Sequence, residues 1–126
     1  MSMDSQDKSF PLMSSFSFAF SGILLALRKE RNMRIHFISS IIVLLVSFYF
    51  SITKIEWVFI LFAIGGMFAL ELLNTAIERV VDLVTAEYHP LAKQAKDLAA
   101  GAVLIYAALS VVIGIVIFLP YVLNLF

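Results

Sequence analysis

The sequence contains no cysteine, and its nine acidic side chains are matched by nine lysines and arginines. Without cysteine, disulfide bonds and thiolate chemistry are excluded. A net charge of zero argues against a nucleic-acid partner, which would require a basic surface. The chain also has no GxxxxGK[ST] sequence, so any nucleotide would be held by a site unlike a P-loop.

Apolar residues dominate instead, at 62% of the 126 residues, with a mean hydropathy of +1.00. This composition is typical of an integral membrane protein. The length predicts one domain, residues 1–126, with about three helical spans of ~20 residues each. Three short spans enclose little interior, so we expect an oligomer. The predicted fold class is an all-α membrane protein.

Long and largely uncharged runs predict three transmembrane helices. The polar stretch from Thr53 to Glu56 is too short for anything but a turn between antiparallel helices. His89 and Pro90 are typical of a helix start, and we expect Pro120 to end the third helix. The predicted spans cover about residues 34–52, 57–84 and 90–119.

Before these spans, apolar residues recur at helical spacing with serines largely between them. We interpret this segment, at about residues 10–28, as an amphipathic helix on the membrane surface. The alternative is the first turn of a longer span, but the polar cluster from Arg28 to Arg34 interrupts any continuous apolar run. The apolar residues at helical spacing are Phe16, Phe20, Ile23 and Leu27.

Cations are distributed unequally between the two ends of the predicted spans. If the N-terminus is inside, Lys54 is the only lysine or arginine outside, and eight are cytoplasmic. This asymmetry follows the positive-inside rule and predicts a cytoplasmic N-terminus. The eight cytoplasmic cations are Lys8, Arg28, Lys29, Arg31, Arg34, Arg79, Lys93 and Lys96.

One face of the second predicted span carries a row of polar side chains, which we call the acidic stripe. Carboxylates within a bilayer are costly, so such a stripe is by default a functional-site hypothesis. Glu71 lies 14 residues after Trp57, about 21 Å along a helix. In a hydrocarbon layer of about 30 Å, Glu71 is then roughly 10 Å below the cytoplasmic surface. The acidic stripe consists of Glu71, Asn74, Glu78 and Asp82, spaced i, i+3, i+7 and i+11.

Three helix ends are expected to meet at the cytoplasmic surface, bringing Glu30, Lys96 and Asp97 to the level of Glu78. Carboxylates beside water suit Mg²⁺, which prefers oxygen ligands and usually keeps waters and substrate phosphates. Glu30 and Glu78 could hold the metal, and Lys96 could contact the phosphates of a nucleotide. Glu71 could accept the proton of an alcohol at headgroup depth.

Spacing alone also fits a polar seam between helices or a conduction path. In that interpretation the acidic stripe pairs with Arg79, Asn32 or Arg31. Asp82 is interpreted as a solvated helix end whose charge balances Arg79. Both histidines lack a second His or carboxylate at ligand spacing on a shared face. The residues that we therefore interpret as interfacial, rather than as metal ligands, are His36 and His89.

The stripe and the residues after it form a specific pattern: ELLNTAIERVVD at 71–82, EYHPLAKQAKD at 87–97 and, earlier, ERNMRIH at 30–36. With this pattern, the sequence resembles the small bacterial lipid kinase family of diacylglycerol kinase and undecaprenol kinase. The resemblance extends over about residues 16–119. The stretch HPLAKQAKDLAAGAVL is more similar to the undecaprenol kinase branch.

The resemblance implies a homotrimer of three-span protomers in the bacterial inner membrane, each with a surface helix. It implies active sites between neighbouring protomers at the cytoplasmic face, which use ATP and Mg²⁺ to phosphorylate a lipid alcohol, undecaprenol or diacylglycerol. Glu71 would be the general base, and Glu30 and Glu78 the metal ligands. Asn74 would orient the base or the substrate. The residues expected at the nucleotide are Lys96 and Asp97, with Glu87, Tyr88 and His89 beside it.

The surface helix departs from the family pattern at Ser17 and Phe18, where the family often has a basic residue and a tyrosine. A charge and a hydroxyl group are thus missing from a segment expected to contact nucleotide or lipid. A non-enzymatic scaffold or ion-path subunit is the rival from another class. Turnover of ATP would distinguish the two.

Overall fold

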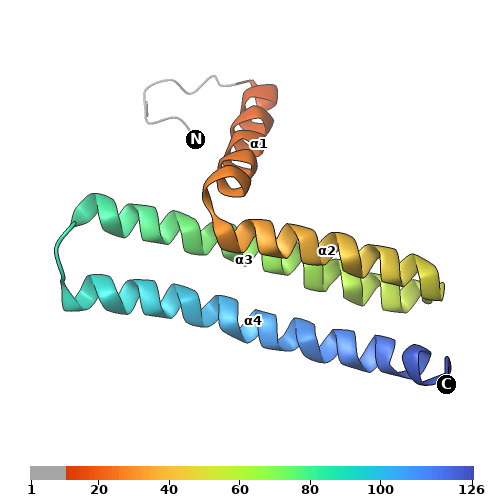
Figure 1. Ribbon diagram of the computed structural model, residues 1–126. Helices are drawn as coiled ribbons and strands as arrows, with labels where there is room; N and C mark the ends of the chain where they lie inside the picture. Colours follow the sequence, from red (N-terminus) through yellow and green to blue (C-terminus); the bar gives the residue numbers. More distant parts are fainter. Residues whose placement is uncertain (1–10) are drawn as a thin grey trace.

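The computed structural model describes residues 11–126, and this part of the chain folds into four helices. Three of them run side by side, and the first leaves them at a steep angle (Figure 1). The expectations for Lys8 and for the first residue of the surface helix, Phe10, lie outside the described residues. The helices are α1 (Leu12–Lys29), α2 (Arg31–Phe50), α3 (Lys54–Val84) and α4 (Pro90–Leu123).

By length and composition, each of the four helices could cross a membrane, which confirms an all-helical membrane protein. The predicted surface segment forms a helix of its own, because Glu30 adopts an extended backbone (φ −106°, ψ 118°) between α1 and α2. Arg34 stabilises this break by donating hydrogen bonds to the carbonyl oxygens of Leu27 (3.3 Å) and Arg28 (2.9 Å). The alternative of one longer first span is therefore wrong.

Several predicted helix bounds need correction. The first span begins and ends earlier than residues 34–52, because α2 runs from Arg31 to Phe50 and Ser51 adopts a left-handed conformation after it. The second span begins at Lys54, before Trp57, because Thr53 and Glu56 form a capping box that satisfies backbone N–H groups at the start of α3. The third span does not end at Pro120, since α4 continues to Leu123. The residue after this proline, Tyr121, is held in place by other helices, and these contacts offset the backbone hydrogen bond that proline cannot make.

Aromatic side chains join the C-terminal end of α2, the N-terminal end of α3 and the C-terminal end of α4. These three ends lie opposite the α3–α4 loop. The Tyr121 ring stacks on Phe50 with centroids 5.4 Å apart, and its hydroxyl donates to Glu56. Beside them, a small apolar core joins all three helices. These contacts fix the depth of α4 relative to α3. The buried residues of this core are Ile52, Ile60 and Ile117.

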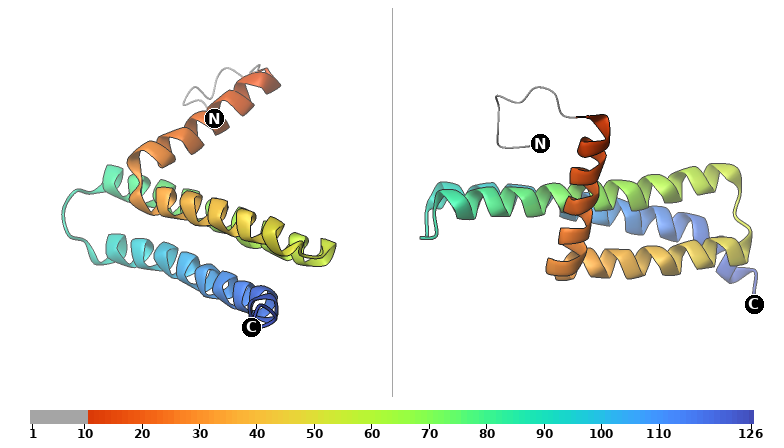
Figure 2. Two further views of the ribbon diagram at one scale, coloured as in Figure 1. Left: turned by 45° about the vertical axis from the view of Figure 1, so that its right-hand side comes forward. Right: turned by 90° about the horizontal axis from the view of Figure 1, so that it is seen from above.

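The α3–α4 pair is longer than α2, and its loop end extends past the point where α1 joins α2 (Figure 1). The left view of Figure 2 shows α1 leaving the three other helices at an angle, and the right view shows it crossing over α3. In α1, Ala26 is buried, whereas apolar side chains such as Phe16 and Phe20 are exposed. The C-terminal end of α1 therefore lies beside the last turns of α3, before the α3–α4 loop. The candidate site is in this part of the molecule.

Candidate active site

Glu71 is the most buried charged residue among those described, with 3% of its surface exposed. It lies on α3, on the side that faces α2. The nearest charged partner is His36 of α2, whose Nε2 atom is 3.7 Å from Oε2 of Glu71. A carboxylate that is buried in this way within a membrane helix is costly, which makes Glu71 a candidate functional residue.

Asn74, one turn along α3, is also buried and lies between Glu71 and Glu78 in the acidic stripe. Its Nδ2 donates a hydrogen bond to Oε1 of Glu78 (3.3 Å). Its Oδ1 has no hydrogen-bond partner within residues 11–126. A buried oxygen without a partner costs free energy, so this atom is available to a ligand.

Glu30 reaches the same region from the break between α1 and α2. Its Oε1 accepts a hydrogen bond at 3.3 Å from Nη2 of Arg79, the residue next to Glu78. Glu30 and Glu78 both lie near enough to Glu71 for the charges to interact. The three predicted carboxylates therefore gather around one end of α3.

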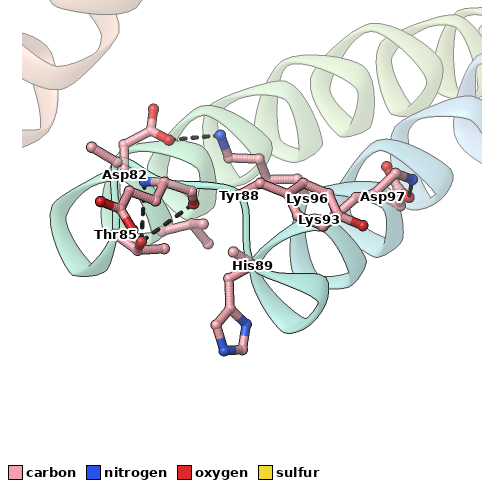
Figure 3. A pocket seen from close by; sticks show the side chains of 11 residues that line it. Asp82, Thr85, Tyr88, His89, Lys93, Lys96 and Asp97 are labelled. Carbon is pink, nitrogen blue, oxygen red and sulfur yellow. Dashed lines mark hydrogen bonds and ion pairs between the residues drawn. The ribbon is translucent and has the colours of Figure 1, made fainter.

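A pocket of about 290 Å³ lies between the facing ends of α3 and α4 (Figure 3). Lys96 reaches across it to Asp82, with Nζ 2.6 Å from Oδ1, and Lys93 pairs with Asp97 along α4 at 2.5 Å. The His89 ring points away from these pairs (Figure 3). All the residues predicted beside a nucleotide line this pocket, namely Glu87, Tyr88, His89, Lys96 and Asp97.

A second, mainly apolar pocket of about 530 Å³ separates α1 from α3. Phe18, Gly22 and Ala26 line it from α1. Thr75 and Arg79 provide its polar groups from α3, on the side adjacent to the acidic stripe.

Comparison with known families shows that residues 17–118 match prokaryotic diacylglycerol kinase. The chain belongs to the prokaryotic diacylglycerol kinase family. It is therefore a lipid kinase, and the interpretation as a non-enzymatic scaffold is excluded.

Three relatives within this kinase family show the range of similarity. The chain is 50% identical to undecaprenol kinase of Bacillus subtilis over 94% of its own length and 98% of that protein. It is 34% identical to diacylglycerol kinase of Haemophilus influenzae over 83% of its own length and 86% of that protein. For diacylglycerol kinase of Escherichia coli the identity is 27%, with coverage of 80% and 83%.

Two ion pairs of this lipid kinase differ from the sequence interpretation. Asp82 does not pair with Arg79. Asp82 forms an ion pair with Lys96 of α4, and Arg79 forms an ion pair with Glu30. The partners come from other helices, which the spacing within α3 cannot indicate.

Sequence reasoning also missed two roles of histidine. His36 lies beside Glu71, although the two residues are 35 positions apart, because α2 packs on α3. His89 caps α4, since its Nδ1 accepts a hydrogen bond from the backbone N–H of Leu91 (3.1 Å). The second role was recognisable from the His-Pro helix start. The first required knowledge of the helix packing.

Proposed function

We propose that this lipid kinase transfers the γ-phosphoryl group of ATP to undecaprenol and forms undecaprenyl phosphate. The observation that carries the proposal is the buried Glu71 carboxylate, with the Glu30 and Glu78 carboxylates nearby. Glu71 takes the proton as the hydroxyl O–H bond breaks. The alcohol oxygen forms the new bond to the γ-phosphorus. The bond between the γ-phosphorus and the β–γ bridging oxygen breaks, and ADP leaves with its electron pair.

The oxygen donors around Glu78 fit a hard divalent cation. Residues 11–126 contain no group of three or more His, Cys, Asp or Glu side chains that could hold a metal alone. Mg²⁺ does not need such a cage, because it usually retains waters and substrate phosphates. Glu30 and Glu78 would hold the ion, and the free Oδ1 of Asn74 is a further acceptor. When bound, Mg²⁺ would neutralise charge on the phosphates.

The pocket between α3 and α4 is the proposed nucleotide site. Lys96 would contact the phosphates, with Asp97 next to it in sequence. Without ATP, Lys96 pairs with Asp82 and Lys93 with Asp97, so these groups exchange an internal partner for the nucleotide. The residues proposed beside the nucleotide are Glu87, Tyr88 and His89.

The apolar pocket between α1 and α3 is the proposed binding site of the lipid alcohol. Its lining offers few polar groups, principally Thr75 and Arg79. A polyprenol is hydrocarbon up to its hydroxyl group and needs no further hydrogen-bond partners. Similarity to undecaprenol kinase of Bacillus subtilis supports this alcohol over diacylglycerol.

The working enzyme is proposed to be a homotrimer in the bacterial inner membrane, with its N-terminus and active sites at the cytoplasmic face. In this arrangement α1 lies on the membrane surface. The exposed apolar side chains of α1 and its angle to the other helices support this placement (Figure 2). The partnerless Oδ1 of Asn74 is consistent with a site that neighbouring protomers complete.

Phosphate transfer from radiolabelled ATP to a panel of lipid alcohols tests the proposal. The purified protein is given undecaprenol or diacylglycerol in mixed micelles with Mg²⁺. We expect a higher kcat/KM for undecaprenol than for diacylglycerol. A preference for diacylglycerol would assign the other alcohol, and no transfer to either would refute the proposal.

A further inference from the structure

Two titratable side chains from different helices meet below the proposed metal site. His36 of α2 places Nε2 3.7 Å from Oε2 of Glu71 on α3, and the two side chains are 25% and 4% exposed. This separation is slightly beyond a direct hydrogen bond, and a small rotation of either side chain would bring a ring N–H group within reach of the carboxylate. The Ser40 hydroxyl group donates to the His36 carbonyl oxygen one turn along α2 (2.7 Å).

The other charged groups near Glu71 are acids or have partners elsewhere, which leaves His36 as the basic side chain beside its carboxylate. Glu30, from the break before α2, and Glu78, on α3, are acids and repel an ionised Glu71. The Asn32 side chain of α2 interacts with the same carboxylate but is uncharged. Two nearby cations have other partners, since Arg79 pairs with Glu30 and Lys96 of α4 pairs with Asp82.

We propose that His36 is a positioning residue, which holds the Glu71 carboxylate in the orientation that accepts the proton of the lipid alcohol. The imidazole ring lies next to Oε2, and Oε1 receives the proton. The inference rests on the proposed function, because Glu71 must act as the base. His36 itself contacts neither substrate nor metal in this scheme.

The rival explanation is that His36 only helps α2 to pack on α3. The ring borders a cavity of about 350 Å³ between α2, α3 and α4, so a different side chain can be accommodated without overpacking. His36→Leu removes the polar contact. His36→Gln keeps an N–H group that can reach the carboxylate. Ser39→Ala, at another position on α2 that borders the same cavity, is the matched control.

Kinetics of the purified full-length protein with Mg-ATP and undecaprenol separate the two explanations. We expect His36→Leu to lower kcat on the order of 10- to 100-fold with little change in KM, because a misplaced base slows only the proton transfer. His36→Gln should recover most of the rate, and Ser39→Ala should match the wild type. Full activity of His36→Leu would overturn the proposal.

A double-mutant cycle with Glu71→Asp shows whether His36 acts through Glu71. If His36 acts through Glu71, the His36→Leu substitution should lower kcat much less in the Glu71→Asp variant than in the wild type. Two losses that multiply would contradict the positioning role. Thermal unfolding and gel filtration of each variant in detergent identify any loss that comes from misfolding.

A readout without turnover keeps this inference separate from the choice of substrate. Histidine labelled with ¹⁵N gives one set of ring resonances for His36 and one for His89. Glu71→Gln should shift the His36 resonances and leave those of His89 in place. If the wild type phosphorylates neither alcohol, the proposed function fails, whereas an unmoved His36 resonance refutes the pairing by itself.

Discussion

The Arg79 guanidinium of α3 donates a hydrogen bond to the Glu30 carboxylate, 49 residues earlier in the chain. This contact ties the break between α1 and α2 to the residue that follows Glu78. A surface ion pair of this kind contributes little to stability. Its importance is positional, because it holds Glu30, one proposed metal ligand, against the turn of α3 that carries the other, Glu78.

Glu30→Gln and Glu78→Gln should each raise the Mg²⁺ concentration needed for half-maximal activity, or abolish activity. An amide keeps the size of the side chain but loses the charge that attracts the cation. Titration of Mg²⁺ at saturating ATP measures this. Glu56→Gln, near the opposite end of α3, is the control. Unchanged Mg²⁺ dependence in both site variants would exclude the proposed metal ligands.

Glu71→Gln should lower kcat by at least roughly 100-fold, since general-base catalysis typically contributes 10²- to 10⁴-fold and an amide cannot accept the proton. The variant should keep the helical content and oligomeric size of the wild type, measured by circular dichroism and light scattering. Normal turnover by a folded Glu71→Gln protein would show that Glu71 is not the general base.

Lys96→Gln should raise KM for ATP roughly tenfold, because the variant loses a charged hydrogen bond to the phosphates. Steady-state kinetics at saturating lipid alcohol measure the change. Lys54→Gln, at the other end of the bundle, should leave kcat and KM unchanged. If Lys54 mattered and Lys96 did not, the predicted orientation of the site would be inverted.

Gly66→Ala should be less stable than Gly65→Ala, although both substitutions raise helix propensity equally. A Cβ atom at Gly66 would overlap the Tyr106 hydroxyl group, which donates to the Phe62 carbonyl oxygen, whereas a Cβ at Gly65 meets nothing within 4 Å. Losing that hydrogen bond costs about 1 kcal/mol. Thermal unfolding in detergent compares the two variants, and equal midpoints would show that Tyr106 does not hold α4 against α3.

Single cysteines can test the orientation, because the natural sequence contains none. In intact spheroplasts, a thiol reagent that does not cross membranes should label Lys54→Cys and leave Arg28→Cys unlabelled. Opening the membrane should expose both. The reverse pattern would place the N-terminus and the active site on the outer side.

Patterns along single helices were predictable from the sequence. The breaks at Glu30 and before Pro90 follow from polar clusters and from the chemistry of proline, and they lie where expected. The end at Pro120 was wrong, because Tyr121 bonds to Glu56 and stacks on Phe50 from another helix. Local rules describe a helix end correctly only where no distant contact competes with them.

The sequence by itself determined that this is a helical membrane protein and indicated the acidic stripe as its candidate functional face, since hydropathy and the 3.6-residue period are properties of neighbouring residues. Only the tertiary structure decided which charges meet. Arg79 turned to Glu30, Asp82 to Lys96 and Glu71 to His36. The physical reason is that partners on separate helices depend on the relative rotation and depth of those helices, which packing between helices sets.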